Sequence, residues 1–153
     1  MTVATAKRRT IDVGSGGTLR RCAKGYDVYT DIVELELGLP GRYVRCAMEK
    51  MRFADKEFQY ARCHHVIEHT YDPDQACHEL TRIAEAGIIS FPPMQAEIMF
   101  GRADHRWFVT VDRGRLLFIK KRHPSYGVPR RVTNCQLNVN FEWEGSFEWQ
   151  VII

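Results

Sequence analysis

The densest group of reactive side chains lies at residues 63–80, CHHVIEHTYDPDQACHEL, with four histidines, two cysteines and four carboxylates in eighteen positions. Within it, residues 65–69 read H-x-x-E-H, a pattern that one class of zinc peptidases uses. Such a site needs His65 and His69 on one face of a stable helix, Glu68 as base and a third ligand from elsewhere. Pro73 leaves that helix only about two turns, because the residue before a proline resists helical geometry. We therefore keep a zinc hydrolase as a third alternative and predict no metal site.

The histidines also have a simpler interpretation. Any one of His64, His65, His69 and His78 is, by default, a surface or capping residue without chemistry. The cluster, however, follows a predicted strand, and open α/β sheets bind their ligands at the carboxyl ends of strands. This placement favours a ligand site that includes His64 and His65, and it leaves His69 and His78 to structure.

The overall composition is that of an ordinary globular protein. The 153 residues suit a single domain, with 44% hydrophobic and 27% charged residues. The net charge of +3 is too small to indicate nucleic-acid binding. No apolar run approaches a membrane span, and residues 1–10 lack the apolar centre of a signal peptide, so we expect a cytoplasmic location. Five cysteines without a C-x-x-C pair argue against a disulfide framework and a cysteine zinc finger.

Up to Pro93, short apolar runs alternate with helix-length segments. The runs predict strands at residues 10–13, 25–29, 43–48, 58–63 and 87–91. The clearest helix begins with Asp72 as N-cap and Pro73 in the first position, and we expect Gly87 to cap its carboxyl end. Strands separated by helices predict an α/β fold with a mainly parallel, Rossmann-like sheet.

After Pro93 the pattern becomes that of antiparallel strands. Residues 107–111 and 115–120 flank Asp112-Arg113-Gly114, a clear hairpin signal. Apolar and polar residues alternate over 137–144 and again over 147–151, which predicts two more strands with one buried face. We expect all of these strands at the edge of the parallel core. Residues 10–93 would then form the core of a single domain, 1–153, and residues 94–153 its β-rich extension.

The order of these motifs resembles that of class I S-adenosylmethionine-dependent methyltransferases. Ile11-Asp12-Val13-Gly14-Ser15-Gly16 looks like their first motif, and Asp27 is similar to the acid that ends their second strand. H-V-I-E-H followed by Asp72-Pro73 resembles their signature after the fourth strand. The resemblance covers about residues 10–93, and residues 100–108 are similar to a branch with a short first crossover and a trailing β-hairpin.

The resemblance implies S-adenosyl-L-methionine as cofactor and assigns residues to it. Asp27 would accept both ribose hydroxyls, and His65 is the candidate general base if the acceptor must lose a proton. Asp12 would support the glycine loop, Met48 and Glu49 would border the adenine, and His64 would lie with His65 beside the methionine end. The implied cofactor-binding set is therefore Asp12, Gly14, Ser15, Gly16, Asp27, Met48, Glu49, His64 and His65.

Several departures from the family pattern keep a second interpretation open. Residues 17–25 are too few for a full crossover helix, and Ala47 stands where many members carry an acid near the adenine. Only nine residues of this sequence precede the first predicted strand, so we expect no counterpart among them of the N-terminal helices that often cover the acceptor site. The alternative is a non-catalytic module with a degenerate methyltransferase fold that holds cofactor or a partner. The acceptor, a small molecule or a macromolecule, stays open, and a homodimer is one way to complete its site.

Overall fold

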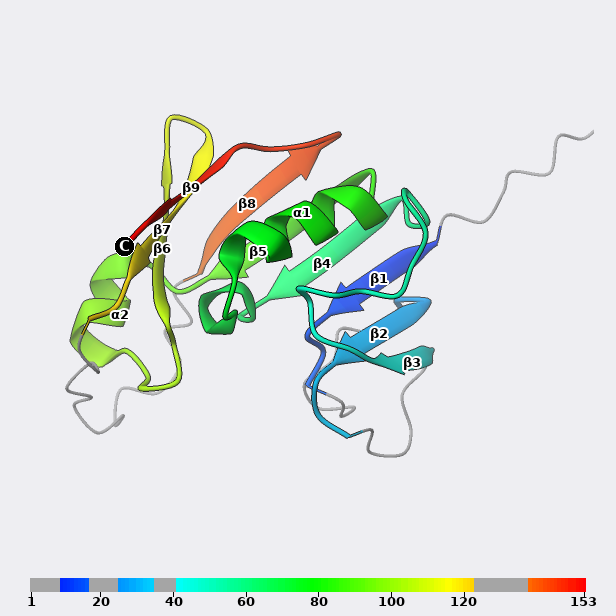
Figure 1. Ribbon diagram of the computed structural model, residues 1–153, viewed down its shortest axis with the longest axis horizontal. Coiled ribbons are helices and arrows are strands. Elements are labelled where there is room, and N and C mark those ends of the chain that lie inside the picture. The colour runs from blue at the N-terminus through cyan, green and yellow to red at the C-terminus, as the bar shows by residue number, and fades with distance from the viewer. Residues whose placement is uncertain (1–8, 17–24, 35–40, 123–137) are drawn as a thin grey trace, which may run out of the picture.

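The computed structural model describes residues 9–16, 25–34, 41–122 and 138–153 (Figure 1). Its main element is a six-stranded sheet in the order β3-β2-β1-β4-β5-β8. Strands β1 to β5 run parallel to their neighbours, and β8 pairs antiparallel with β5. This arrangement confirms the predicted α/β fold class. The strands are β1 (Thr10–Val13), β2 (Val28–Asp31), β3 (Arg42–Arg45), β4 (Tyr60–His64), β5 (Ala86–Phe91) and β8 (Val139–Glu144).

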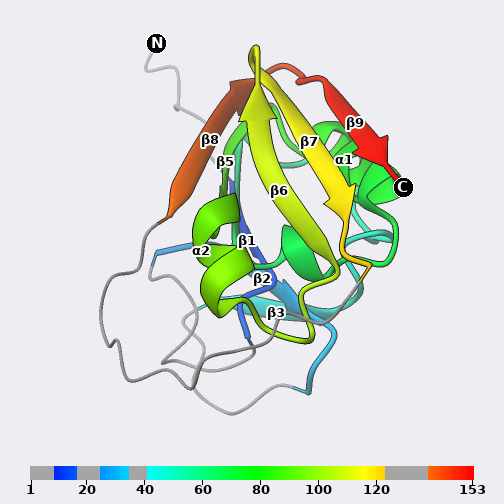
Figure 2. The same ribbon diagram turned by 90° about the vertical axis from the view of Figure 1, so that its left-hand side faces the viewer.

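A second sheet lies beside the first and contains three strands, in the order β6-β7-β9 (Figure 2). Strands β6 (Trp107–Asp112) and β7 (Arg115–Lys120) form the predicted hairpin, and β9 (Trp149–Ile152) pairs parallel with β7. Arg113 (φ 49°) and Gly114 (φ 81°) make its two-residue turn, in the left-handed conformation that tight hairpins require. The expectation that all C-terminal strands extend the core sheet was wrong: only β8 does so.

Two α-helices and one short 3₁₀ turn connect the strands. Helix α1 (Pro73–Ile83) begins as predicted, because the Asp72 side chain accepts a hydrogen bond from the Gln75 backbone N–H. The turn η1 (Ile67–His69) precedes it, and α2 (Met94–Phe100), which the sequence analysis did not predict, follows β5. No helix among the described residues is long and apolar enough to cross a membrane.

The predicted helix cap at Gly87 was wrong. Helix α1 ends at Ile83, and Gly87 lies inside β5. A Cβ atom on Gly87 would lie 2.3 Å from the Ala61 carbonyl oxygen and 3.0 Å from the Trp143 ring. The glycine therefore lets the indole of β8 pack directly on the sheet.

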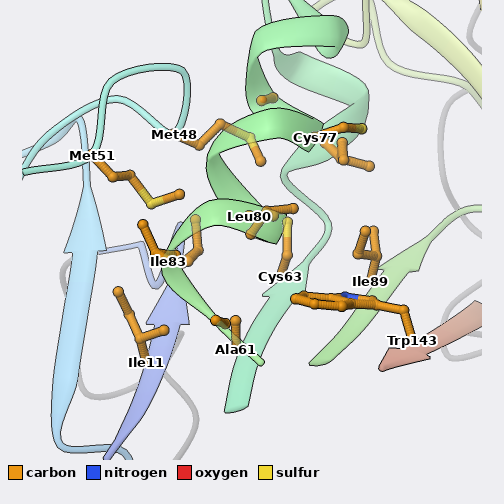
Figure 3. Close-up of a cluster of buried hydrophobic side chains, with 14 of the residues drawn as sticks. Ile11, Met48, Met51, Ala61, Cys63, Cys77, Leu80, Ile83, Ile89 and Trp143 are labelled. Carbon is orange, nitrogen blue, oxygen red and sulfur yellow. The ribbon is translucent and has the colours of Figure 1, made fainter. Parts of the chain in front are cut away.

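The core fills the space between α1 and one face of the sheet (Figure 3). Alternate residues of the strands point toward the helix, as the two-residue period of a β-strand requires. They meet the apolar face of α1, and these contacts exclude water from that side of the sheet. The buried residues include Ile11, Ala61, Cys63 and Ile89 from the strands and Cys77, Leu80 and Ile83 from the helix.

Arg82 of helix α1 forms hydrogen bonds with the segment before β4. Its guanidinium donates to the carbonyl oxygens of Phe53 (2.7 Å) and Met51 (3.0 Å) and to the Glu79 carboxylate (2.7 Å). Glu79 in turn accepts a hydrogen bond from the Met51 backbone N–H at 2.7 Å. This network holds residues 51–53 in place and thereby positions Met48 and Glu49.

Candidate functional site

A glycine loop follows β1 at the carboxyl edge of the sheet. The backbone N–H groups of Gly14 and Ser15 both donate to the Thr30 carbonyl oxygen, at 2.8 and 2.9 Å. Gly14 has a φ of +72°, and a Cβ atom there would lie 2.1 Å from Cγ2 of Val66. Val66 belongs to the H-V-I-E-H motif, so this motif packs directly against the loop. Only glycine meets both demands at position 14.

The acid at the carboxyl end of β2 is Asp31. One carboxylate oxygen accepts from the Gly16 N–H at 2.6 Å, and the other accepts from the Ile32 N–H at 2.7 Å. Asp31 is thus joined to the glycine loop. The sequence offered a signal for it, because Val28-Tyr29-Thr30 favours a strand and Asp31 is the acid that directly follows this run.

The prediction that Asp27 ends the second strand was wrong. Strand β2 begins at Val28, so Asp27 precedes it and lies at the opposite, amino edge of the sheet. Its carboxylate accepts from the Thr10 backbone N–H (3.0 Å) and hydroxyl (3.2 Å), which fixes the start of β1. The predicted strand, 25–29, began three residues and ended two residues too early, so it stopped short of Asp31.

His65 stands at the end of β4 with its ring held on both sides. Nδ1 lies 3.2 Å from a Glu68 carboxylate oxygen, and Nε2 lies 2.7 Å from Oδ1 of Asn138. Its backbone adopts the left-handed conformation (φ +53°), and its N–H donates to the Ser90 carbonyl oxygen. Because both nitrogens face oxygen atoms of the protein, a substrate can reach either nitrogen only by displacing one of these contacts.

The peptidase arrangement is absent from this part of the structure. Residues 67–69 form a single 3₁₀ turn, and His65 lies before it in a left-handed conformation. His65 and His69 therefore do not share a helical face. The zinc-peptidase alternative fails on this geometry.

His64 is the last residue of β4 and is half-buried. Burial lowers its pKa to about 4, and the nearby Arg62 guanidinium adds to the effect. The ring is therefore neutral at pH 7. It packs edge-to-face against the His65 ring, with 4.5 Å between centroids.

Acidification is expected to destabilise the protein partly through His64. The unfolded chain binds a proton on this ring near pH 6.5, whereas the folded chain resists it until about pH 4. The stability contribution is complete above pH 6.5 and is lost as the pH falls toward 4. Between pH 7 and pH 5, the unfolding free energy of His64→Gln should fall by about 1 kcal/mol less than that of wild type, a figure already reduced for solvent screening. Urea denaturation at several pH values measures this, with His78→Gln as the exposed control. Equal slopes for His64→Gln and wild type would contradict it.

The remaining predicted residues have structural contacts. Asp12 is buried on the other face of the sheet and pairs with Arg62 at 2.7 Å. Met48 is buried, and its side chain points into the core (Figure 3). Glu49 accepts hydrogen bonds from the Thr70 hydroxyl and the Tyr71 N–H, which ties it to the segment after η1.

The structure thus brings together five of the predicted residues at one edge of the sheet: Gly14, Ser15, Gly16, His64 and His65. Strand β1 lies between β2 and β4, and such a reversal of strand order is where open α/β sheets form a ligand crevice. A glycine loop, an acid at the end of β2 and a polar cluster after β4 suit a nucleoside ligand whose hydroxyls need an acceptor.

Three solved structures show partial similarity to the chain. The YcgJ protein from Bacillus subtilis is 17% identical, with a TM-score of 0.45, over 56% of this chain and 44% of that one. The PH0226 protein from Pyrococcus horikoshii OT3 is 19% identical, with a TM-score of 0.48, over 67% and 62%. An S-adenosylmethionine-dependent methyltransferase from Mesorhizobium loti is 15% identical, with a TM-score of 0.46, over 74% and 57%. The chain spans less than two thirds of each. Curated proteins gave no significant match.

The sequence model of the methyltransferase domain family matches residues 11–91, which is more than half of the chain. The matched range begins in β1 and ends with β5, so it contains the glycine loop, Asp31 and the H-V-I-E-H motif. The chain therefore belongs to the methyltransferase domain family.

Proposed function

We propose that this protein binds S-adenosylmethionine over the carboxyl ends of β1, β2 and β4 and transfers its methyl group to an acceptor. The observation that carries the proposal is the hydrogen bond from the Gly16 N–H of the glycine loop to the Asp31 carboxylate. Val66 packs against the same loop at Gly14. The hydrogen bond between Gly16 and Asp31 places a carboxylate that can accept from a ribose diol beside the backbone of the glycine loop.

The residues present fit this cofactor. Gly16 carries no Cβ atom and adopts a φ of +79°, so a ligand can approach the backbone of the loop closely at this position. Asp31 carries a carboxylate at the strand end where nucleoside-binding sheets place their ribose acceptor. A cofactor without phosphates also needs no helix N-terminus after the loop to hold a pyrophosphate.

S-adenosylmethionine supplies a methyl group that its sulfonium sulfur already activates. The task of the protein is then to position donor and acceptor and to exclude water. A neutral His64 adds no positive charge at the edge of the sheet that would receive the sulfonium. His65 is oriented by Glu68 and Asn138, and it would take a proton only from an acceptor that displaces one of these contacts.

The test is direct binding followed by turnover. Isothermal titration should give micromolar dissociation constants for S-adenosylmethionine and S-adenosylhomocysteine, and no comparable binding of ATP or NAD. Failure of both adenosyl ligands to bind would overturn the proposal. Transfer of labelled methyl groups to pools of small molecules, proteins and RNA would then identify the acceptor class, with Asp31→Ala as the inactive control. Binding without transfer to any pool would favour the non-catalytic alternative.

A further inference from the structure

A second group of side chains that can ligate a metal shares Glu68 with the site just described. Glu68 and His69 come from η1, and His105 comes from the connection between α2 and β6. One ligand atom of each lies within 4.8 Å of the others. The backbone N–H of Arg106 donates to the Glu68 carbonyl oxygen at 2.8 Å, so the two segments are already joined beside the cluster.

The two oxygens of the Glu68 carboxylate differ in their hydrogen bonding. Glu68 is 1% exposed, and its Oε1 faces Nδ1 of His65. Within the described part of the chain, its buried Oε2 has no hydrogen-bond partner. A buried carboxylate oxygen without a partner is unfavourable, and its presence calls for a missing donor or cation.

The two imidazoles are oriented through the nitrogen that a metal would not use. Nδ1 of His105 lies 2.7 Å from a Glu97 carboxylate oxygen, and Nδ1 of His69 lies 3.2 Å from the Asp104 carbonyl oxygen. A carbonyl and a carboxylate only accept hydrogen bonds, so Nδ1 carries a proton, and in the neutral ring Nε2 is the nitrogen with a lone pair for a metal. Histidines that ligate metals show this same outer contact.

The outer contact of His105 is itself tightly held. Lys121 Nζ donates to the second oxygen of Glu97 at 2.6 Å, and both side chains are 4% exposed. A Cβ atom on Gly101 would lie 2.2 Å from this Glu97 oxygen, so glycine leaves the space that the carboxylate occupies. Several buried groups therefore fix the orientation of the His105 imidazole ring.

We propose that Glu68, His69 and His105 form a binding site for a divalent transition metal of the zinc type. Two imidazoles and one carboxylate form a three-ligand set that zinc and its neighbours use with a fourth position open, whereas magnesium and calcium prefer oxygen ligands. Ligand atoms of a tetrahedral zinc site lie about 3.4 Å apart, so closure requires shifts of about 1 Å. His69, whose side chain is 34% exposed, is the least buried of the three ligands, so we expect it to make most of that movement.

A bridging water would also satisfy Glu68, but it would not account for two imidazoles held by their Nδ1 atoms. The proposed ligand set also differs from the peptidase pattern, because His65 binds Glu68 Oε1 and leaves Oε2 for the metal. The metal would fasten η1, at the edge of the core sheet, to the segment that enters β6. This inference does not depend on the proposed methyl transfer.

The experiment uses the full chain, freed of metal by a chelator and titrated with zinc chloride. We expect one zinc ion per chain, with Glu68→Gln or His69→Ala weakening binding at least 100-fold and Glu97→Gln weakening it 10- to 100-fold. His78→Ala is the matched control, because its exposed ring contacts Asp74 and Trp149 and none of the three ligands, so its loss should leave the affinity unchanged. Circular dichroism of each metal-free variant confirms that it is folded.

Cobalt substitution identifies the ligands independently. The visible bands of tetrahedral Co²⁺ should appear in wild type and His78→Ala and vanish in His69→Ala. A thiolate-to-cobalt charge-transfer band would assign the ion to cysteines and overturn the proposal. So would the absence of stoichiometric zinc binding, or equal affinities in wild type, Glu68→Gln and His69→Ala.

Discussion

Replacing Asp31 with alanine is expected to weaken S-adenosylmethionine binding at least 100-fold. The carboxylate is the acceptor that we assign to the ribose hydroxyls, and two charge-assisted hydrogen bonds together account for about 3 kcal/mol. Loss of the contact with the Gly16 N–H should also loosen the loop. Titration calorimetry measures the affinity, and Asp31→Asn, which keeps one oxygen acceptor, should fall between alanine and wild type.

Asp27→Ala is the matched control for this substitution. It removes an acid of the same type from the opposite edge of the sheet, where it binds Thr10. We expect unchanged cofactor affinity and a loss of about 1–2 kcal/mol of unfolding free energy. The reverse outcome, with affinity lost in Asp27→Ala and kept in Asp31→Ala, would show that the ribose acid is Asp27 after all.

Gly14→Ala should destabilise the fold by about 3 kcal/mol, through two separable effects. An alanine at φ +72° carries a backbone penalty of about 1 kcal/mol, and its Cβ would overlap the Val66 methyl groups at a further cost of about 2 kcal/mol. Urea denaturation measures the sum. Loss of cofactor binding should accompany it, because relief of the overlap displaces the H-V-I-E-H motif.

Gly145→Ala isolates the backbone effect. Gly145 has nearly the same φ, +70°, but no atom lies within 4 Å of the position where its Cβ would be built. Val66→Ala combined with Gly14→Ala should recover about 1–2 kcal/mol relative to the sum of the single substitutions. If Gly14→Ala and Gly145→Ala cost the same, the contact between Val66 and the loop has no energetic importance.

The elements that the sequence predicted well are those with local signals. Strand β1, the start of α1 and the β6–β7 hairpin are marked by adjacent residues: a β-branched run, an Asp-Pro pair and an Arg-Gly turn. The fold class followed from the alternation of such signals. None of these features needed information from a distant part of the chain.

Three of the failures concern positions that distant residues determine. The limits of β2 depend on its pairing with β1 and β3, since Gly25 to Tyr29 alone is as apolar as Val28 to Asp31. Gly87 resembles a helix cap until Trp143 packs on it. The alternation at 147–151 predicts a strand but cannot say that its neighbour is β7.

The candidate site also contains both residues with a local sequence signal and residues that only the fold brings together. The glycine loop and the H-V-I-E-H motif were evident because each is a short continuous pattern. Asp31 was missed because the predicted strand ended two residues too early. The cluster of Glu68, His69 and His105 is invisible in sequence, because His105 reaches it only through the fold of α2 and the turn before β6.

The path of residues 138–152 has a consequence for synthesis of the protein. Strand β8 supplies the outer neighbour of β5, and β9, only a few residues later, supplies the outer neighbour of β7. Before this stretch leaves the ribosome, β5 and β7 each have an unpaired edge, and these strands contain Ile88, Ile89 and Phe118. Open apolar edges are templates for pairing with other chains, and such long-range pairings form slowly. One stretch of chain thus covers the open edges of both β5 and β7, and until it arrives these edges can pair with other chains.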